Sequence, residues 1–177
     1  MIFIGIGANL NSPEHGAPLQ TCEAAVHALT NSGLRVMEQS NWYESAPVPV
    51  SDQPWFINGV VRVETDLDAP GLMHLLHTIE DDFGRVRVKR NEARVLDMDL
   101  LCYDEMVMRV ADGAGPVVPH PRMTARAFVL KPMAELAPDW HHPITGQRIK
   151  ALIDALPADQ VARPLSLAGG LPDTRQA

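Results

Sequence analysis

The sequence predicts an α+β protein whose elements follow the order strand, helix, strand, strand, helix, strand. Three observations support this prediction: two stretches carry apolar residues at helical spacing, four have the pattern of strands, and Pro- or Gly-containing breaks separate them. The order is that of a ferredoxin-like sandwich. The chain has 177 residues, 46% of them hydrophobic, which suits one domain with a buried core. We therefore expect a single domain over residues 1–157, with extra C-terminal helices after residue 120.

The first part of the chain is predicted to form a strand, a helix and a second strand. Residues 2–8 are an Ile-rich run typical of a buried strand. A helix is expected from Pro18 to Asn31, with Gly33 as its C-terminal stop. Its apolar positions are Leu19, Cys22, Val26 and Leu29. Residues 34–44 are expected to form one strand.

A Pro-rich loop leads into the third strand. Proline neither continues a helix nor pairs as a central strand, so residues 46–54, with three prolines, should form a loop. Residues 55–65 alternate in the manner of a half-buried strand. One face would carry Ile57, Gly59, Val61 and Val63. The other face would carry Phe56, Asn58, Arg62 and Glu64.

The second helix and the fourth strand complete the predicted unit. Asp68 can cap a helix that ends at Gly84. The apolar stripe of this helix is Leu72, Leu75, Leu76, Ile79 and Phe83. A basic loop and a strand over residues 95–103 follow. Met123–Leu136 and Ile149–Leu156 are expected to be short helices, and the Pro- and Gly-containing stretch 158–177 a loosely held or disordered tail.

Charge and cysteine content narrow the class of protein. The net charge of −7 argues against a nucleic acid or an anionic membrane as partner, because most of the surface would repel either one. No stretch is apolar enough to span a bilayer, and the N-terminus lacks the pattern of a secretory signal. Cys22 and Cys102 lie in apolar settings, so we expect reduced thiols and a cytoplasmic location.

Asp97 and Asp99 are the strongest candidates for chemistry. Side chains two apart on a strand point to one face, with Cα atoms roughly 6.5–7 Å apart. Two carboxylates at that distance repel each other, and a hard cation such as Mg²⁺ would remove the repulsion. The alternative is an ordinary half-buried strand whose polar face carries two acids. Asp is disfavoured in strands, so we prefer the metal site.

Arginines precede the acid pair. Arg85, Arg87 and Arg94 carry planar guanidinium groups that suit bidentate phosphate contact, although a solvated charged loop is the commoner use of such a run. Together with the acids they predict metal-assisted phosphoryl transfer. The segment 5–11 lacks the Lys-Ser/Thr of a P-loop and the third glycine of a dinucleotide fingerprint, so metal and side chains would have to hold the nucleotide.

A pocket for a flat heterocycle is also predicted. Phe56 offers an aromatic face and Asn58 presents a donor and an acceptor together, with Phe128 a candidate for the opposite face. An edge aromatic, a turn-proximal Asn and a core Phe are the plainer alternatives. Two further pairs are candidates for the nucleotide site, with an ordinary surface as the alternative for each. They are His120 with Arg126, and His77 with Glu80, which share one helix face.

These residues lie in an ordered set of motifs that resembles the 6-hydroxymethyl-7,8-dihydropterin pyrophosphokinase family of folate biosynthesis. The resemblance runs from Ile4 to about Trp140. Its motifs are Gly5-Ile6-Gly7-Ala8-Asn9-Leu10, Tyr43-Glu44-Ser45-Ala46-Pro47-Val48, Asp52-Gln53-Pro54-Trp55-Phe56-Ile57-Asn58, Ile79-Glu80 with Gly84-Arg85, Arg94-Val95-Leu96-Asp97-Met98-Asp99-Leu100-Leu101, and Val118-Pro119-His120-Pro121-Arg122-Met123 with Arg126-Ala127-Phe128.

The resemblance implies an enzyme that transfers pyrophosphate from ATP to the hydroxymethyl group of the pterin and releases AMP. It implies that Asp97 and Asp99 hold two Mg²⁺ ions and that Arg85 and Arg94 act with them in catalysis. The implied ATP-binding residues are His77, Glu80, Arg85, Arg87, Arg94, His120 and Arg126. The implied pterin-binding residues are Ser45, Ala46, Val48, Phe56, Asn58, Asn91 and Phe128.

The sequence also departs from the family pattern. Asn91-Glu92-Ala93 places an acid where the family often has Trp-Gly-Pro or Asn-Ala-Pro, and Val95 stands where Thr is usual. Two rival functions therefore stay open: a catalytically impaired ferredoxin-like binding module, and a Mg-dependent phosphohydrolase that uses water as nucleophile. We expect ATP and the pterin as the partners, and a monomer.

Overall fold

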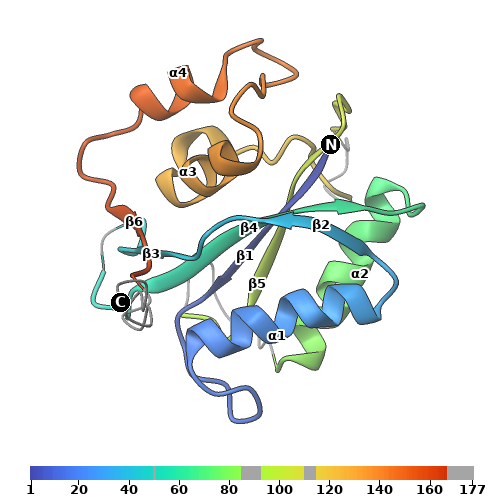
Figure 1. The fold of residues 1–177 in the computed structure, drawn as a ribbon, viewed down its shortest axis with the longest axis vertical. Helices are drawn as coiled ribbons and strands as arrows, with labels where there is room; N and C mark the ends of the chain where they lie inside the picture. The colour runs from blue at the N-terminus through green and yellow to red at the C-terminus, as the bar shows by residue number, and fades with distance from the viewer. Residues whose placement is uncertain (50, 85–92, 110–114, 167–177) are drawn as a thin grey trace, which may run out of the picture.

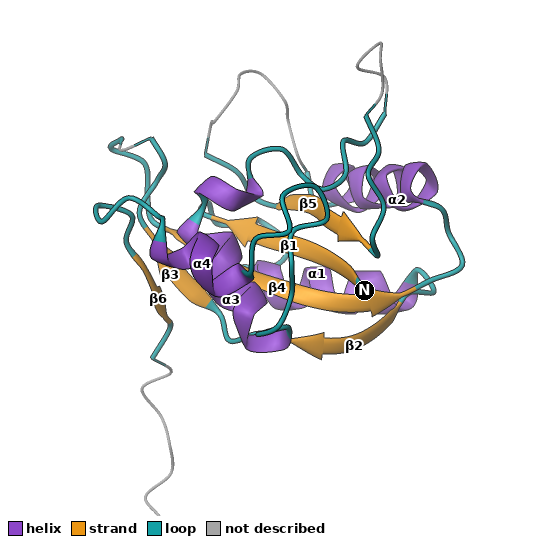
Figure 2. Ribbon diagram, turned by 90° about the horizontal axis from the view of Figure 1, so that it is seen from above, coloured by secondary structure: helices purple, strands orange, loops and turns teal. Residues whose placement is uncertain are grey.

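The computed structural model describes residues 1–49, 51–84, 93–109 and 115–166. Within these residues, a six-stranded antiparallel sheet has helices on both faces (Figure 1, Figure 2). The strands are β1 (Ile2–Ala8), β2 (Arg35–Gln39), β3 (Tyr43–Ser45), β4 (Phe56–Glu64), β5 (Asp97–Tyr103) and β6 (Ala162–Pro164). The helices are α1 (Pro18–Asn31), α2 (Ala69–Asp82), α3 (Ala127–Leu136) and α4 (Ile149–Asp154), with a 3₁₀ turn, η1 (Met123–Ala125).

The strand order is β5-β1-β4-β3-β6, and β2 also pairs with β4. Residues 34–44 were expected to form one strand, and this is wrong, because the segment forms β2 and β3 with a break at Ser40. The Ser40 hydroxyl accepts a hydrogen bond from the Val60 backbone N–H at 3.0 Å and so takes the place of a backbone acceptor. The break lets β4 pair with β2 along one half and with β3 along the other.

Helices α1 and α2 cover one face of the sheet (Figure 1). Ile4 and Ile6 of β1 meet Leu29 of α1 and Leu76 of α2 there in one apolar cluster. Val61 and Val63 of β4 belong to the same cluster, as the alternation over residues 55–65 predicted. Asp68 caps α2 as expected, by accepting a hydrogen bond from Gly71 N–H at 2.8 Å. Cys22 lies in this cluster as a free thiol, and burial raises its pKa to about 12.

Helices α3 and α4 cover part of the opposite face (Figure 2). Phe3 and Val60 of the sheet pack there against Met123 and Leu130, with the free thiol of Cys102 nearby. Val60 lies on the β4 face that the sequence assigned to Phe56, Asn58, Arg62 and Glu64. That face therefore has an apolar middle, because helices near the end of the chain cover it.

Both predicted C-terminal helices are shorter than expected. The helix predicted over Met123–Leu136 is interrupted at Arg126, whose φ of −124° and ψ of 111° are extended rather than helical. This residue separates η1 from α3. Helix α4 ends at Asp154, since Pro157 disfavours helical backbone in the residue before it.

Residues 162–164 correct the expectation of a loose tail from residue 158. They form β6, which pairs antiparallel with β3 and places Ala162 opposite Ser45. The short strand has a single buried side chain, Ala162, too little apolar pattern to predict it from sequence. Among the described residues, no helix combines the length and apolar character needed to cross a bilayer.

Candidate active site

A cleft opens over β1, β4 and β5 on the face that α3 partly covers. Its empty volume, including the open mouth, is about 910 Å³. Nine residues predicted from the sequence line it: Ala46, Val48, Phe56, Asn58, Arg94, Asp97, Asp99, Arg126 and Phe128. Candidates for phosphate, metal and ring binding, which are spread over more than 80 residues of the chain, are therefore brought to one cavity.

The acid pair lies on β5. Its two carboxylates point into the cleft, whereas Met98 between them points to the core and is 2% exposed. Gly7 and Gly5 of β1 stand opposite Asp97 and Asp99 in the sheet. A side chain at Gly7 would place its Cβ 2.8 Å from Asn58 Oδ1. The two glycines thus leave room between the acid pair and the ring-binding residues.

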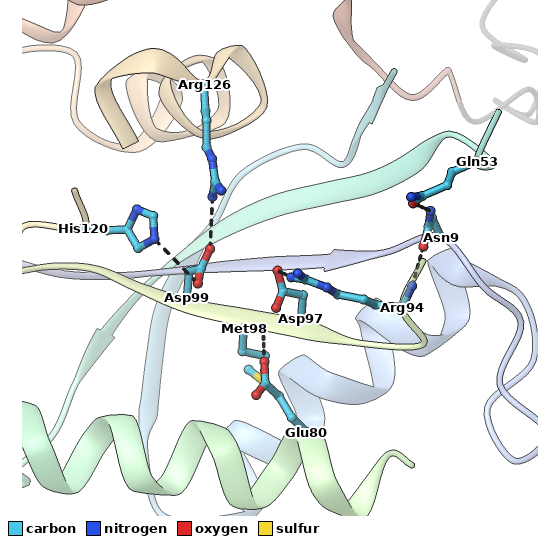
Figure 3. Close-up of polar contacts among 9 residues, drawn as sticks. All are labelled: Asn9, Gln53, Glu80, Arg94, Asp97, Met98, Asp99, His120 and Arg126. Atoms are coloured by element: carbon cyan, nitrogen blue, oxygen red, sulfur yellow. Dashed lines mark hydrogen bonds and ion pairs between the residues drawn. The ribbon is translucent and has the colours of Figure 1, made fainter. Parts of the chain in front are cut away.

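Each carboxylate has an arginine partner (Figure 3). Asp97 is paired with Arg94, three residues earlier. Asp99 Oδ2 lies 3.3 Å from Arg126 Nη1, and its Oδ1 lies 3.9 Å from His120 Nε2. Burial lowers the pKa of His120, against the opposing attraction of Asp99. The site therefore alternates acidic and cationic groups, an arrangement that can bind a polyphosphate together with its counter-ions.

The donor set fits Mg²⁺ bound together with a substrate. In the described part of the chain, no group of three or more His, Cys, Asp or Glu side chains could hold a metal ion. Asp97 and Asp99 would thus supply two hard oxygen groups and leave the remaining positions open. Mg²⁺ is commonly held in this way, by one or two carboxylates plus water and substrate phosphates.

The ring-binding candidates lie beside the acid pair. Phe56 and Phe128 line the cleft, and Asn58 Nδ2 donates a hydrogen bond to Ser45 Oγ at 2.8 Å. Ser45 is buried and is not among the residues that line the cleft, so its predicted pterin contact stays a prediction. The guanidinium of Arg126 lies over the Phe128 ring, 5.4 Å from its centroid.

Glu80 and His77 are placed differently. Glu80 is buried on α2, and its Oε1 accepts a hydrogen bond from the Met98 N–H at 2.7 Å (Figure 3). His77 is half-buried on the same helix. Neither lines the cleft. Their predicted ATP contacts stay predictions. The predicted ATP contacts of Arg85 and Arg87 and the predicted pterin contact of Asn91 lie outside the described residues.

Asn9 was not predicted as a site residue, although it lies in the first of the family motifs. Its buried Oδ1 accepts a hydrogen bond from Arg94 N–H at 2.6 Å, and its Nδ2 donates to the Pro54 carbonyl at 3.1 Å. The Asn9 backbone N–H also donates to Arg94 O at 3.0 Å. A polar residue directly after a buried strand was the available signal, since a buried amide needs several partners.

Comparison with known proteins gives a consistent result. The family model for 7,8-dihydro-6-hydroxymethylpterin-pyrophosphokinase (HPPK) matches residues 3–138. A Synechocystis sp. protein named 2-amino-4-hydroxy-6-hydroxymethyldihydropteridine pyrophosphokinase is 37% identical over 172 residues, which cover 95% of this chain and 84% of that protein. A Pseudomonas aeruginosa protein of the same name is 36% identical over 163 residues, covering 92% of this chain and 95% of that protein.

Other relatives are longer than this chain. The chain spans 20% of the folic acid synthesis protein fol1 from Pneumocystis carinii, to which it is 32% identical over 155 residues, 88% of its own length. Among solved structures, a Plasmodium falciparum HPPK-DHPS triple mutant matches with a TM-score of 0.66 at 14% identity. The match covers 86% of this chain and 43% of that one, and it is a likeness of fold. The resemblance inferred from the motifs is thus confirmed, and the chain belongs to the 7,8-dihydro-6-hydroxymethylpterin-pyrophosphokinase family.

Proposed function

We propose that this chain transfers the terminal two phosphoryl groups of ATP to 6-hydroxymethyl-7,8-dihydropterin. The hydroxymethyl oxygen attacks the β-phosphorus and loses its proton, and a new P–O bond forms. The bond from the β-phosphorus to the oxygen shared with the α-phosphate breaks, so AMP leaves with that electron pair. Such a reaction needs positioned groups and charge stabilisation rather than a covalent enzyme intermediate.

One observation carries this proposal: the acid pair and the aromatic slot open into the same cleft. Asp97, Asp99 and Phe128 all line it. A phosphoryl donor held near the acids would therefore face a ring held between Phe56 and Phe128. A phosphohydrolase has no use for that slot, and a binding module has no use for two acids facing the same cavity.

Asp97 and Asp99 are proposed to hold Mg²⁺, two ions in all, together with ATP oxygens. Bound there, the metal would neutralise phosphate charge and lower the pKa of the attacking hydroxyl. Arg94 pairs with Asp97, and Arg126 pairs with Asp99. With metal bound to the acids, the two guanidinium groups would be available to the phosphates, which they can contact in bidentate fashion.

The ring slot is proposed to bind the pterin by stacking and edge recognition. Phe56 and Phe128 would flank the bicyclic ring, and Asn58 would read its edge with Oδ1 as an acceptor. Asn58 is preset for this because Ser45 takes one of its amide donors. The neighbouring Ala46 and Val48 line the same wall. Ring position would thus be fixed before the phosphates react.

Four broader assignments also stay proposals. The order β5-β1-β4 followed by the β2/β3 segment supports the ferredoxin-like arrangement, with β2 and β3 together acting as its second strand. The cytoplasmic location, the monomeric state and the single-domain boundary at residue 157 stay predictions from the sequence.

A coupled assay tests the function directly. Purified protein is incubated with ATP, Mg²⁺ and 6-hydroxymethyl-7,8-dihydropterin, and AMP and the pterin diphosphate are measured. We expect both products in equal amounts, and almost no ATP consumption without the pterin. Release of phosphate or pyrophosphate without pterin would indicate a hydrolase. Ligand binding without any turnover would indicate a binding module.

A further inference from the structure

A segment near the end of the chain contacts both walls of the ring slot. Residues 160–165, here called the strap, follow α4 and lie beyond the stretch 3–138 matched by the family model. β6 lies within the strap and pairs with β3. None of the site assignments above includes it.

The strap holds the first wall, the segment around Ser45–Val48, through the sheet edge. The Ala46 N–H donates a hydrogen bond to Val161 O at 3.2 Å, and Ala46 is the first residue of this wall that lines the cleft. Arg163 pairs with Glu44 of β3, and its guanidinium lies over the Trp55 ring, 5.4 Å from the centroid. The first wall, and Trp55 next to Phe56, are therefore attached to the strap by backbone and side-chain contacts.

The strap holds the second wall, the start of α3, through Gln160. Its Oε1 accepts a hydrogen bond from Ala127 N–H at 2.9 Å, and its Nε2 donates to Ala125 O at 2.7 Å. Ala162 then packs in one buried cluster with Ala127, against which Phe128 also packs. The first N–H groups of a helix need partners from outside it, and Arg126 at the N-cap supplies none from its side chain. Gln160 supplies that cap from a distant part of the chain.

These two hydrogen bonds bracket Arg126. They hold the peptide groups on either side of it and so fix the extended backbone between η1 and α3. From that position Arg126 reaches Asp99 at 3.3 Å and lies over Phe128. Displacing this turn would move both Arg126, which pairs with Asp99, and Phe128, which forms one wall of the slot.

We propose that Gln160 is a positioning residue that sets the spacing of the ring slot by fixing the Arg126–Phe128 turn, with the strap joining this turn to the opposite wall. The inference rests on the proposed function. Loss of Gln160 should weaken pterin binding more than ATP binding. Phe128 lies next to the Ala127 peptide group that Gln160 holds, whereas several charged groups would share the binding of the ATP phosphates.

The test compares Gln160→Met, nearly equal in volume but without the hydrogen bonds, with Gln147→Met at an exposed glutamine of the same C-terminal region. KM is measured for each substrate, the urea unfolding midpoint is determined, and amide hydrogen exchange is followed over residues 125–130. Loss of two hydrogen bonds should raise the pterin KM about tenfold and change the ATP KM less than about twofold. Exchange over residues 125–130 should increase in Gln160→Met and stay unchanged in Gln147→Met.

Either of two results would overturn the inference. One is an unchanged pterin KM together with unchanged exchange. The other is a loss of affinity for both substrates in proportion to a lower unfolding midpoint, which would indicate general destabilisation. Failure of the proposed function is distinguishable, because it would appear as a parent enzyme without pterin turnover. Faster exchange over residues 125–130 in Gln160→Met would still support the clamp in that case.

Discussion

The two faces of the sheet differ in how completely they are covered. The face under α1 and α2 is closed by a continuous apolar cluster, whereas α3 and α4 leave part of the other face open as the cleft. β5 contributes to both faces, because its Met98 and Leu100 are buried in the apolar cluster while Asp97 and Asp99 alternate with them and face the cleft. Stability and catalysis should therefore be separable by substitutions only a few residues apart.

The largest expected effect follows from removing one acid of the pair. Asp97→Ala should lower kcat at least about 10³-fold, since a carboxylate proposed to hold Mg²⁺ is lost. Pterin affinity should stay nearly unchanged, because the ring slot does not include this carboxylate. Steady-state assays and a calorimetric pterin titration check this. Turnover within tenfold of the parent would remove Asp97 from the catalytic site.

A substitution on the closed face, under α1 and α2, should lower stability and leave catalysis unchanged. Leu76→Ala removes a side chain of α2 that is fully buried against the sheet, and it should lower the free energy of unfolding by about 2–5 kcal/mol. At a temperature where the variant is folded, both KM values should match the parent, because Leu76 lies across the sheet from the cleft. Urea unfolding measures the loss. A large change in KM without a loss of stability would show that the faces are coupled.

The aromatic wall should give an intermediate effect on one substrate. Phe128→Ala should raise the pterin KM about 10- to 100-fold, through lost stacking and burial, and leave the ATP KM nearly unchanged. Phe83→Ala is the matched control, since this partly buried phenylalanine stacks on His15 at 4.2 Å on the other side of the sheet. An equal rise in the pterin KM for both variants would argue against a ring-specific wall.

Asn9 links two loops at the edge of the cleft, and its loss should have a smaller effect. Asn9→Ala removes the acceptor for Arg94 N–H and the donor to Pro54 O, which should cost about 1–3 kcal/mol of unfolding free energy. kcat/KM should also fall, because Arg94 loses a fixed backbone. Asn9→Asp keeps the acceptor, so it should lie between Asn9→Ala and the parent. A variant as active and as stable as the parent would exclude this positioning role.

Local signals made much of the fold predictable. α1 was placed with its observed bounds because apolar spacing, Pro18 and Gly33 all act within a few residues. Where partners are distant the sequence was less informative: the break at Ser40 depends on Val60, and the break at Arg126 depends on Gln160. The weak pattern of β6 could not predict a strand whose partner, β3, lies more than 100 residues earlier.

The residues of the candidate site also differ in whether a local pattern or a distant partner determines their position. Asp97 and Asp99 could be found because strand parity alone places them on one face. From the residues alone, Phe128 was one candidate for the wall opposite Phe56, with a core position as the alternative, and the resemblance to a family favoured the first. No pattern around Asn9 or Gln160 indicates which groups they bind, because their partners lie 85 and 33 residues away. Residues that act by holding other residues in place are thus the ones that sequence patterns identify least well.

The smallest expected effect concerns pH and the partly covered face. His142 packs edge-on against Trp140, and its Nδ1 accepts hydrogen bonds from the Ile144 and Thr145 N–H groups, both at 3.3 Å. Burial lowers its pKa below the usual 6.5. The unfolded chain then binds this proton more readily than the folded chain, so the free energy of unfolding should fall as the pH drops below about 6.5.

Urea unfolding between about pH 7.5 and about pH 5.5 measures this dependence. His142→Asn, which keeps an acceptor but cannot titrate, should make the fall in stability less steep. His27→Asn, on the exposed side of α1, is the control and should leave the pH dependence as in the parent. Equal slopes for the parent and His142→Asn would show that protonating His142 does not weaken this face, and that its two hydrogen bonds do not depend on a neutral ring. A shallower dependence of stability on pH in His142→Asn would show that protonating His142 weakens the covered part of this face. If the substrate KM values are unchanged as well, this weakening does not alter the cleft beside it.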